Sequence, residues 1–178
     1  MNIVCCGKHV SIRQISHEDT NNIVRWRNHP NVLKNFIDQQ QITFESHEKW
    51  LATKVFTGEV IQFIIRDNET QKDIGSVFIR DIDMNHRHGE FGIFIGEDDF
   101  RGKGRGTEAC QLICKYAFDK IGLERIYLRV LANNSGAIRS YQKVGFVAEG
   151  VFRNHVIVNG KKSDLMFMGL LKEEFTYE

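Results

Sequence analysis

The stretch of sequence that decides the fold runs from Gly89 to Thr107 and reads GEFGIFIGEDDFRGKGRGT. Its apolar segment, Phe91 to Ile95, is typical of a buried strand. After three acidic residues, the glycine-rich segment 101–106 leads directly into a helical pattern of apolar residues from Ala109 to Ala117. A strand, a glycine-rich turn and a helix N-terminus in this order predict an anion site, because exposed N–H groups and the helix dipole favour a phosphate there.

The spacing of the loop residues narrows the kind of phosphate site. A P-loop needs Ser or Thr directly after its lysine, whereas Gly104 follows Lys103 here. A dinucleotide-binding loop needs G-x-G-x-x-G, whereas the three loop glycines are spaced evenly by two. The pattern that remains is Arg101-x-x-Gly104-x-Gly106, and the basic side chains of the loop make a phosphate or pyrophosphate the expected ligand.

A second motif, from Asn134 to Phe146, reads NSGAIRSYQKVGF. Together the two motifs resemble those of the Gcn5-related N-acetyltransferase (GNAT) superfamily, over roughly residues 8–172. In that superfamily the first motif holds the pyrophosphate of acetyl-CoA, and the second supplies a helix beside the pantetheine arm. The resemblance therefore implies an acetyltransferase that passes acetyl directly from acetyl-CoA to an amine, without a cysteine nucleophile and without a metal.

The order of apolar patterns predicts an α/β fold in a single domain, residues 1–178. An antiparallel meander is expected first, followed by a β-α-β-α-β run, which gives a mixed, mostly antiparallel sheet flanked by helices. The resemblance further implies that the central strands splay apart and that acetyl-CoA lies between them. We expect strands at 10–15, 61–66, 74–82, 88–95, 126–131, 146–158 and 163–171, and helices at 16–27, 32–36, 44–54, 104–121 and 135–144.

Composition places the chain among ordinary soluble proteins. Hydrophobic residues make up 42% and charged residues 26% of 178 residues, and the net charge is +1. No general attraction to nucleic acid or to a membrane surface is expected from this charge. Cys110 and Cys114 lie at i, i+4 on a predicted helix and are expected to be core fillers. No signal-peptide pattern precedes Lys8, so we expect a cytoplasmic protein.

The resemblance assigns roles residue by residue. The backbone of Phe94 and Ile95 is expected to pair with pantetheine, and a backbone N–H of the same strand to polarise the carbonyl. Tyr141 is the candidate general acid; the alternative is a core aromatic on the helix face. Asn134 is expected to cap its helix and to lie near CoA. The residues expected to bind acetyl-CoA are Phe94, Ile95, Arg101, Gly102, Lys103, Gly104, Arg105, Gly106, Thr107 and Asn134.

Two residues at the start of the central strand are candidates for handling the proton of the amine. Glu90 is the candidate base or water-positioning carboxylate, because an ammonium must lose a proton before it attacks. The alternative is an exposed strand glutamate without a catalytic role. His88 is a weaker candidate near the acceptor, because histidine titrates near neutral pH.

The acceptor is a small-molecule amine in the preferred interpretation. Segments around Trp26 and Trp50 resemble bacterial amino-sugar N-acetyltransferases of pseudaminic-acid synthesis, which act on a UDP-linked 4-amino-dideoxy sugar. Trp26 is then expected to stack on the sugar or base, and Arg27 to pair with the diphosphate. Trp50 could stack in the same way; the alternative for both tryptophans is packing of a helix against the sheet, and it is favoured more for Trp50 than for Trp26.

Other acceptors and another class of protein remain open. The second half is equally similar to RimJ/RimL-type protein N-terminal acetyltransferases and to spermidine acetyltransferases. A polyamine would favour an acidic pocket, which residues 37–60 do not indicate. A non-catalytic acyl-CoA-binding regulatory module is the alternative class, and the intact loop and Tyr141 favour an enzyme. A homodimer is compatible with the resemblance.

Overall fold

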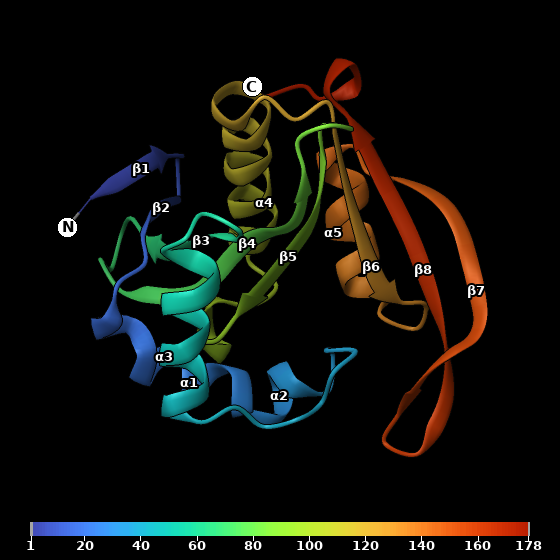
Figure 1. The fold of residues 1–178 in the computed structure, drawn as a ribbon, viewed down its shortest axis with the longest axis horizontal. Helices are drawn as coiled ribbons and strands as arrows, with labels where there is room; N and C mark the ends of the chain where they lie inside the picture. The colour runs from blue at the N-terminus through green and yellow to red at the C-terminus, as the bar shows by residue number, and fades with distance from the viewer. Residues whose placement is uncertain (1, 178) are drawn as a thin grey trace.

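The computed structural model describes residues 2–177, which form an eight-stranded sheet with helices on both faces (Figure 1). The strands are β1 Ile3–Cys6, β2 Val10–Gln14, β3 Ile61–Asp67, β4 Asp73–Asp83, β5 His88–Ile95, β6 Arg125–Leu131, β7 Val147–Val158 and β8 Lys161–Leu171. The α-helices are α1 Thr20–Asn28, α2 Pro30–Leu33, α3 Phe44–Trp50, α4 Arg105–Tyr116 and α5 Ser135–Val144. Short helical turns extend several of these helices: His17–Asp19 before α1, Leu51–Val55 after α3 and Ala117–Ile121 after α4.

The sheet has the order β1-β2-β3-β4-β5-β6-β8-β7. Neighbouring strands are antiparallel except for β5 and β6, which are parallel and are connected through α4. The predicted mixed, mostly antiparallel α/β fold is therefore confirmed. Strand β1 was not predicted from the sequence, because Ile3–Cys6 is only four residues long and lies at the edge of the sheet, paired with β2 alone.

Helix boundaries follow capping signals in the sequence. The Thr43 hydroxyl accepts a hydrogen bond from the Ser46 N–H, and the side-chain oxygen Oδ1 of Asn134 accepts one from the Ala137 N–H at 3.2 Å. Helix α1 ends before Pro30, and Pro30 occupies the first turn of α2, where its missing N–H costs nothing. The helix predicted for 32–36 is therefore displaced by about one turn toward the N-terminus.

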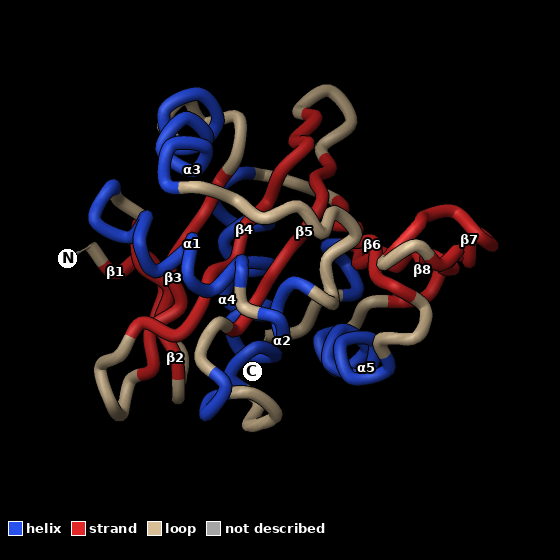
Figure 2. The backbone as a smooth tube through the Cα atoms, turned by 90° about the horizontal axis from the view of Figure 1, so that it is seen from below, coloured by secondary structure: helices blue, strands red, loops and turns tan. Residues whose placement is uncertain are grey.

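Two hydrophobic clusters lie on opposite faces of the sheet, as the alternation in β3 shows. Phe63 and Ile65 belong to the larger cluster beneath α4 and α5, and Ile64 belongs to the smaller cluster beneath α1 and α3. Figure 2 shows α1 and α3 on one side of the sheet and α5 on the other.

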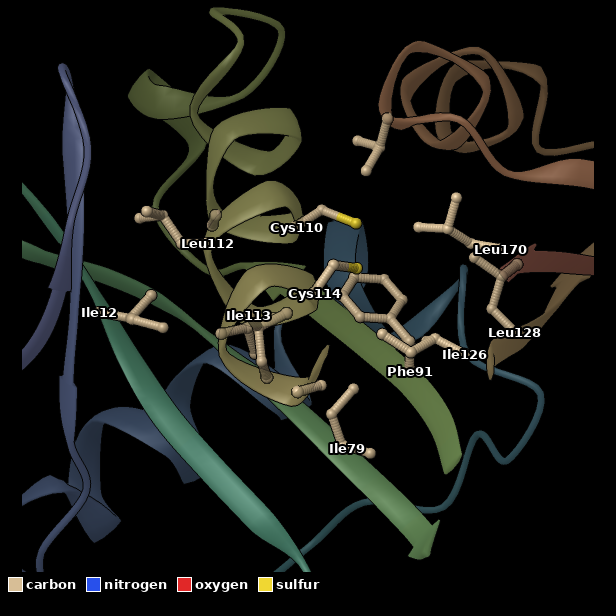
Figure 3. Packing of buried hydrophobic residues seen from close by; sticks show 14 of the residues in the cluster. Ile12, Ile79, Phe91, Cys110, Leu112, Ile113, Cys114, Ile126, Leu128 and Leu170 are labelled. Carbon is tan, nitrogen blue, oxygen red and sulfur yellow. The ribbon is translucent and has the colours of Figure 1, made fainter. Parts of the chain in front are cut away.

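The two cysteines of α4 lie in the larger cluster. Figure 3 shows Cys110 and Cys114 side by side on α4, facing Phe91 of β5. Both thiols are free and completely buried, so the prediction that they fill the core is confirmed. Burial, together with the hydrogen bond to Cys114, raises the pKa of Cys110 well above its ordinary value.

Candidate active site

The parallel strands β5 and β6 separate after a short contact. Their pairing covers His88 to Glu90 on β5 and Arg125 to Tyr127 on β6. Beyond it β6 stays paired with β8 as far as Leu131, and β5 stays paired with β4 as far as Ile95. The sheet therefore opens into a wedge between two otherwise regular strands, which is the splay that the resemblance implied.

A cavity of about 990 Å³ occupies this wedge. Its walls come from β5 and β6, from the loop before α4, from the first turns of α5 and from the α1–α3 side. The binding loop and the candidate acceptor region thus open into one continuous space. The expected cofactor residues in its lining are Phe94, Ile95, Arg101, Gly102, Gly104, Gly106, Thr107 and Asn134.

The loop before α4 has the backbone that a phosphate cradle requires. Gly102 has φ of 71° and Gly104 has φ of 79°, both in the left-handed region that favours glycine. A Cβ at either position would meet no protein atom within 4 Å, so the space beside the loop is open. Helix α4 begins at Arg105, and its first N–H groups adjoin this space. The loop therefore fits the diphosphate of acetyl-CoA.

Two of the three loop cations are already engaged with the protein. The Arg101 guanidinium donates to the carbonyl oxygens of Ile95 at 2.9 Å and Gly96 at 3.4 Å. Arg105 Nε donates to the fully buried Asp67 carboxylate at 3.0 Å. Both side chains hold the loop against the sheet. The expectation that they simply add charge for the ligand therefore needs correction: they shape the loop, and Lys103 is the exposed cation.

The helix beside the cavity, α5, is tied to the loop and to α2. Thr107 on α4 and Ser140 on α5 share a hydrogen bond of 2.7 Å between their hydroxyls. Besides capping α5, Asn134 donates to the Asn35 side chain at 3.4 Å. The capping role expected for Asn134 is confirmed by its bond to Ala137, and its role at CoA stays a prediction.

Tyr141 lines the cavity while its ring packs in the core. The ring meets Phe91 edge to face at 5.7 Å and lies 6.1 Å from Phe146. Burial, with a smaller contribution from Cys110, raises the pKa of Tyr141 well above its ordinary value. The phenol therefore stays protonated throughout the physiological range. The alternative interpretation, a core aromatic, is therefore observed, and the general-acid role of Tyr141 stays a prediction.

Glu90 is a buried carboxylate held by two arginines. Arg129 of β6 donates to both of its oxygens, at 2.8 and 2.9 Å, and Arg80 of β4 lies 3.3 Å away. Burial opposes ionisation, but the hydrogen bonds and charges of these arginines outweigh it and lower the pKa of Glu90. A carboxylate with a lowered pKa is a weak proton acceptor, so this placement favours positioning over base catalysis.

The two tryptophans exchange the roles that we expected. Trp26 is only 1% exposed and belongs to the smaller hydrophobic cluster, and its indole N–H donates to Glu97 at 2.7 Å. The close approach of Gly96 explains this burial, because a Cβ there would lie 2.0 Å from the indole. The prediction that Trp26 stacks on the acceptor is therefore wrong. Trp50 lines the cavity instead, with its N–H bonded to Gln62 at 3.1 Å.

Arg27, the second acceptor candidate, does line the cavity. Its guanidinium lies 3.5 Å above the Phe36 ring, and its Nη1 atom is buried without a hydrogen-bond partner within residues 2–177. Burial, only partly offset by Asp38 and reinforced by Arg80, lowers the pKa of Arg27 to about 10. An unpaired buried guanidinium facing a cavity is suited to an anionic ligand group.

His88 lies outside the cavity lining, and its assignment to acceptor binding is wrong. Its ring contacts His86 at 6.2 Å and Tyr127 at 5.7 Å, at the closed end of the wedge where β5 and β6 are still paired. Sequence proximity to Glu90 suggested a shared site, but the strand carries His88 away from the cavity.

His47 lines the cavity but was not assigned to the site from the sequence. His47 of α3 is 5% exposed and lines the cavity, and its Nδ1 lies 3.0 Å from the Thr20 hydroxyl. Its helical spacing with Trp50 could have indicated that both face the same way, since residues three apart share one helix face.

The described residues contain no cluster of His, Cys, Asp or Glu suited to a metal, and no helix among them is long and apolar enough to cross a bilayer.

A splayed parallel pair with a glycine-rich loop at a helix start defines an acyl-CoA-dependent transferase. The acetyltransferase (GNAT) domain model matches residues 9–147, and the chain belongs to this family. It is an N-acetyltransferase that uses acetyl-CoA as cosubstrate.

Two curated relatives and one solved structure illustrate the relationship. Spermidine N(1)-acetyltransferase of Vibrio cholerae is 26% identical over 167 residues, covering 93% of this chain and 95% of the relative. The solved structure of the V. cholerae spermidine N-acetyltransferase with CoA and spermine has a TM-score of 0.87 at 25% identity, covering 93% and 97% of the two chains. An uncharacterised protein of Methanocaldococcus jannaschii is 30% identical over 77% of this chain, which spans only 28% of that protein.

Proposed function

We propose that the protein transfers the acetyl group of acetyl-CoA to the primary amine of a small molecule. The observation that carries this proposal is the single cavity that joins the loop before α4 to the α1–α3 side. The loop and the N-terminus of α4 would hold the diphosphate, and the edge of β5 beyond Glu90, which β6 leaves unpaired, would take the pantetheine arm. The amine would then enter from the α1–α3 side.

Three groups of this chain have roles in the transfer. A backbone N–H of β5 near Phe94 would polarise the thioester carbonyl. Tyr141 is protonated and would supply a proton to the departing thiolate. Glu90, held by Arg80 and Arg129, would orient a water or the amine through its remaining acceptor capacity. Acetyl-CoA supplies the activated acyl group.

The relatives make a polyamine the first candidate for the acceptor. The V. cholerae relative is named for spermidine, and the solved structure of the V. cholerae spermidine N-acetyltransferase contains spermine. These relatives support a polyamine as the acceptor. The amino sugar was the acceptor preferred from the sequence. One feature of this chain that suits a polyamine is Asp38 in the cavity lining, although the same lining contains five arginines: Arg27, Arg80, Arg101, Arg129 and Arg139.

The second candidate is an amine that also carries an anionic group, such as a nucleotide-linked amino sugar. The specific observation in its favour is the unpartnered Nη1 atom of Arg27. Asp38 affects the pKa of Arg27 only through charge, and Arg80 nearby adds a like charge. A polycation would bring further positive charge toward these arginines, whereas a phosphate would accept hydrogen bonds from Arg27.

A thiol-release assay distinguishes the candidates. Purified protein and acetyl-CoA are incubated with spermidine, a UDP-4-amino sugar, an aminoglycoside and peptides with free N-termini. Turnover of spermidine, undiminished in Arg27→Gln, would support the polyamine. Turnover of the UDP-amino sugar with a KM raised at least about tenfold in Arg27→Gln, and less in Arg27→Lys, would support the anionic amine. No thiol release with any amine would contradict the proposed function.

A further inference from the structure

A hydrogen-bonded chain leads from the cavity to the surface through His47. Its Nδ1 lies 3.0 Å from Thr20 Oγ1, and the Thr20 hydroxyl donates to a carboxylate oxygen of Glu48. The other Glu48 oxygen lies 2.6 Å from Nδ1 of His17, whose side chain is mostly exposed. His47 itself lines the cavity, and its other ring nitrogen, Nε2, is buried and has no hydrogen-bond partner among the described residues.

The order of donors in this chain fixes the tautomer of His47. An ionised carboxylate accepts hydrogen bonds and donates none, so the single hydroxyl proton of Thr20 points to Glu48. The Thr20 oxygen must then accept from His47, which places a proton on Nδ1. Nε2 therefore carries a free lone pair. The bond from Thr20, partly opposed by burial and supported by His17, lowers the pKa of Glu48 and keeps it ionised.

We propose that Nε2 of His47 is the base that removes the proton from the ammonium form of the acceptor amine. This inference rests on the proposed function. His47 is one of the residues that line the cavity, and the unpartnered lone pair of its Nε2 would be satisfied if an N–H of the acceptor pointed at it. A base whose other ring nitrogen is oriented by a hydrogen bond is the arrangement that recurs in enzymes using histidine bases.

The proton balance of the step is simple. R–NH₃⁺ gives one proton to Nε2 and becomes R–NH₂, and His47 becomes an imidazolium. The amine nitrogen then forms a bond to the carbonyl carbon as the C–S bond breaks, and the thiol takes up one proton while the nitrogen loses one. The imidazolium releases its proton to solvent, and the overall reaction produces an amide, a thiol and one proton. Glu48 stabilises the imidazolium through Thr20.

The charges that face His47 set its protonation. They are Glu48 on its own helix and Asp19 at the start of α1, and both favour the charged ring. Burial of the ring disfavours its charged form and outweighs the two carboxylates, so the pKa of His47 lies below its ordinary value. Asp19 is itself paired with Arg13 at 2.6 Å, and Glu48 with His17. His47 is consequently neutral at physiological pH, with its lone pair available.

Glu90, one of the two carboxylates in the cavity lining, is less suited to this role. Both oxygens of Glu90 already accept hydrogen bonds from Arg129, and Arg80 adds a second positive charge. Protonating Glu90 would remove the carboxylate that pairs with Arg129 and would leave Arg80 with only Asp81, at 3.8 Å. His47 can take a proton while keeping its existing bond to Thr20.

The test compares His47→Asn with wild type, because the asparagine N–H can still reach Thr20 while the Nε2 lone pair is lost. Using the amine of the panel that wild type turns over, we expect kcat/KM to fall about 10²- to 10⁴-fold, with unchanged acetyl-CoA affinity. Hydroxylamine, which is already neutral at neutral pH, should show a much smaller loss. His155→Asn, an exposed histidine on β7, is the matched control and should behave as wild type.

A second measurement does not depend on the acceptor. Nitrogen-15 spectra of the imidazoles, assigned with the His47→Asn protein, should show His47 neutral at neutral pH with its proton on Nδ1. Unchanged kcat/KM in His47→Asn would overturn the inference while leaving the proposed function intact. If wild type turns over no amine, the proposed function fails. The spectra test the inference independently, because a protonated His47 ring or a proton on Nε2 would overturn it.

Discussion

Glu90 of β5 and Tyr127 of β6 are the last paired residues of the two parallel strands. Two residues farther along β6, Arg129 reaches back across the opening and bonds to both oxygens of Glu90. The wedge therefore begins at an ion pair that joins its two walls. This ion pair stabilises the base of the cavity, and it also explains why Glu90 is buried although it is charged.

Replacing Glu90 by glutamine tests this structural role. An amide cannot accept hydrogen bonds from two guanidinium groups with equal strength, and Arg80 and Arg129 would lose their shared counter-charge. We expect the free energy of unfolding to fall by about 2 kcal/mol, measured by urea denaturation. The double variant Glu90→Gln/Arg129→Gln should recover part of the loss. An unchanged urea midpoint in the single variant would contradict this role.

Gly106 allows a test of the loop without damage to the fold. A Cβ at this position would lie 3.6 Å from Ile95 Cγ1, which is an ordinary contact, and alanine favours the helix. We expect Gly106→Ala to keep its melting temperature but to bind acetyl-CoA at least about tenfold more weakly, because Gly106 lines the cavity and a side chain there would hinder close approach of the diphosphate to the loop backbone. Calorimetric titration measures this affinity. Gly150→Ala on β7, where the added Cβ meets no atom within 4 Å, is the control; equal affinity in both variants would refute the loop assignment.

Tyr141→Phe should affect chemistry more than binding. The ring contacts with Phe91 and Phe146 remain, so the core keeps its packing. Loss of the phenolic proton is expected to lower kcat by about 10²-fold or more, with KM for acetyl-CoA nearly unchanged. Steady-state kinetics with the accepted amine measure both constants. A variant that keeps the wild-type kcat would remove Tyr141 from the mechanism and leave it as a core residue.

Asp19 makes stability depend on acid pH. Burial raises its pKa, but the bonds from Arg13 and from the Ser16 N–H outweigh burial, and the pKa of Asp19 is lowered on folding. Its contribution is therefore present above the unfolded pKa of about 3.9 and is lost as pH falls through the folded pKa.

We expect Asp19→Asn to unfold at a lower urea concentration at neutral pH, with a loss of about 2 kcal/mol. The difference from wild type should shrink steadily as the pH is lowered below about 4. Urea midpoints measured at a series of pH values provide the comparison. A constant difference between the two proteins across that range would show that the Asp19 charge does not contribute to stability.

Local signals in the sequence were enough to predict most elements. The helix over Ser135–Val144 and the strand from His88 to Ile95 were predicted with the observed bounds, because a cap, a terminal glycine and an apolar run each act within a few residues. Strand β1 is short and lies at an edge, so its four residues carry no comparable signal.

The candidate site was predicted only where a motif is contiguous. The loop 101–107 and Tyr141 belong to such motifs and lie around one cavity. Trp26, Trp50 and His88 were misplaced, because helix and strand periodicity defines a face but not what covers that face. Tertiary packing buried Trp26 against Gly96 and turned Trp50 toward the cavity.

The sequence by itself determined the family, the order of elements and the loop that fits acetyl-CoA, because each depends on residues close together in the chain. Only the tertiary structure decided which side chains face the acceptor and in what state of charge. Nη1 of Arg27 has no hydrogen-bond partner within residues 2–177, and Nδ1 of His47 on α3 lies beside the Thr20 hydroxyl on α1, because folding brings these segments together. Burial and hydrogen bonding set the pKa of such groups, and both depend on neighbours distant in sequence.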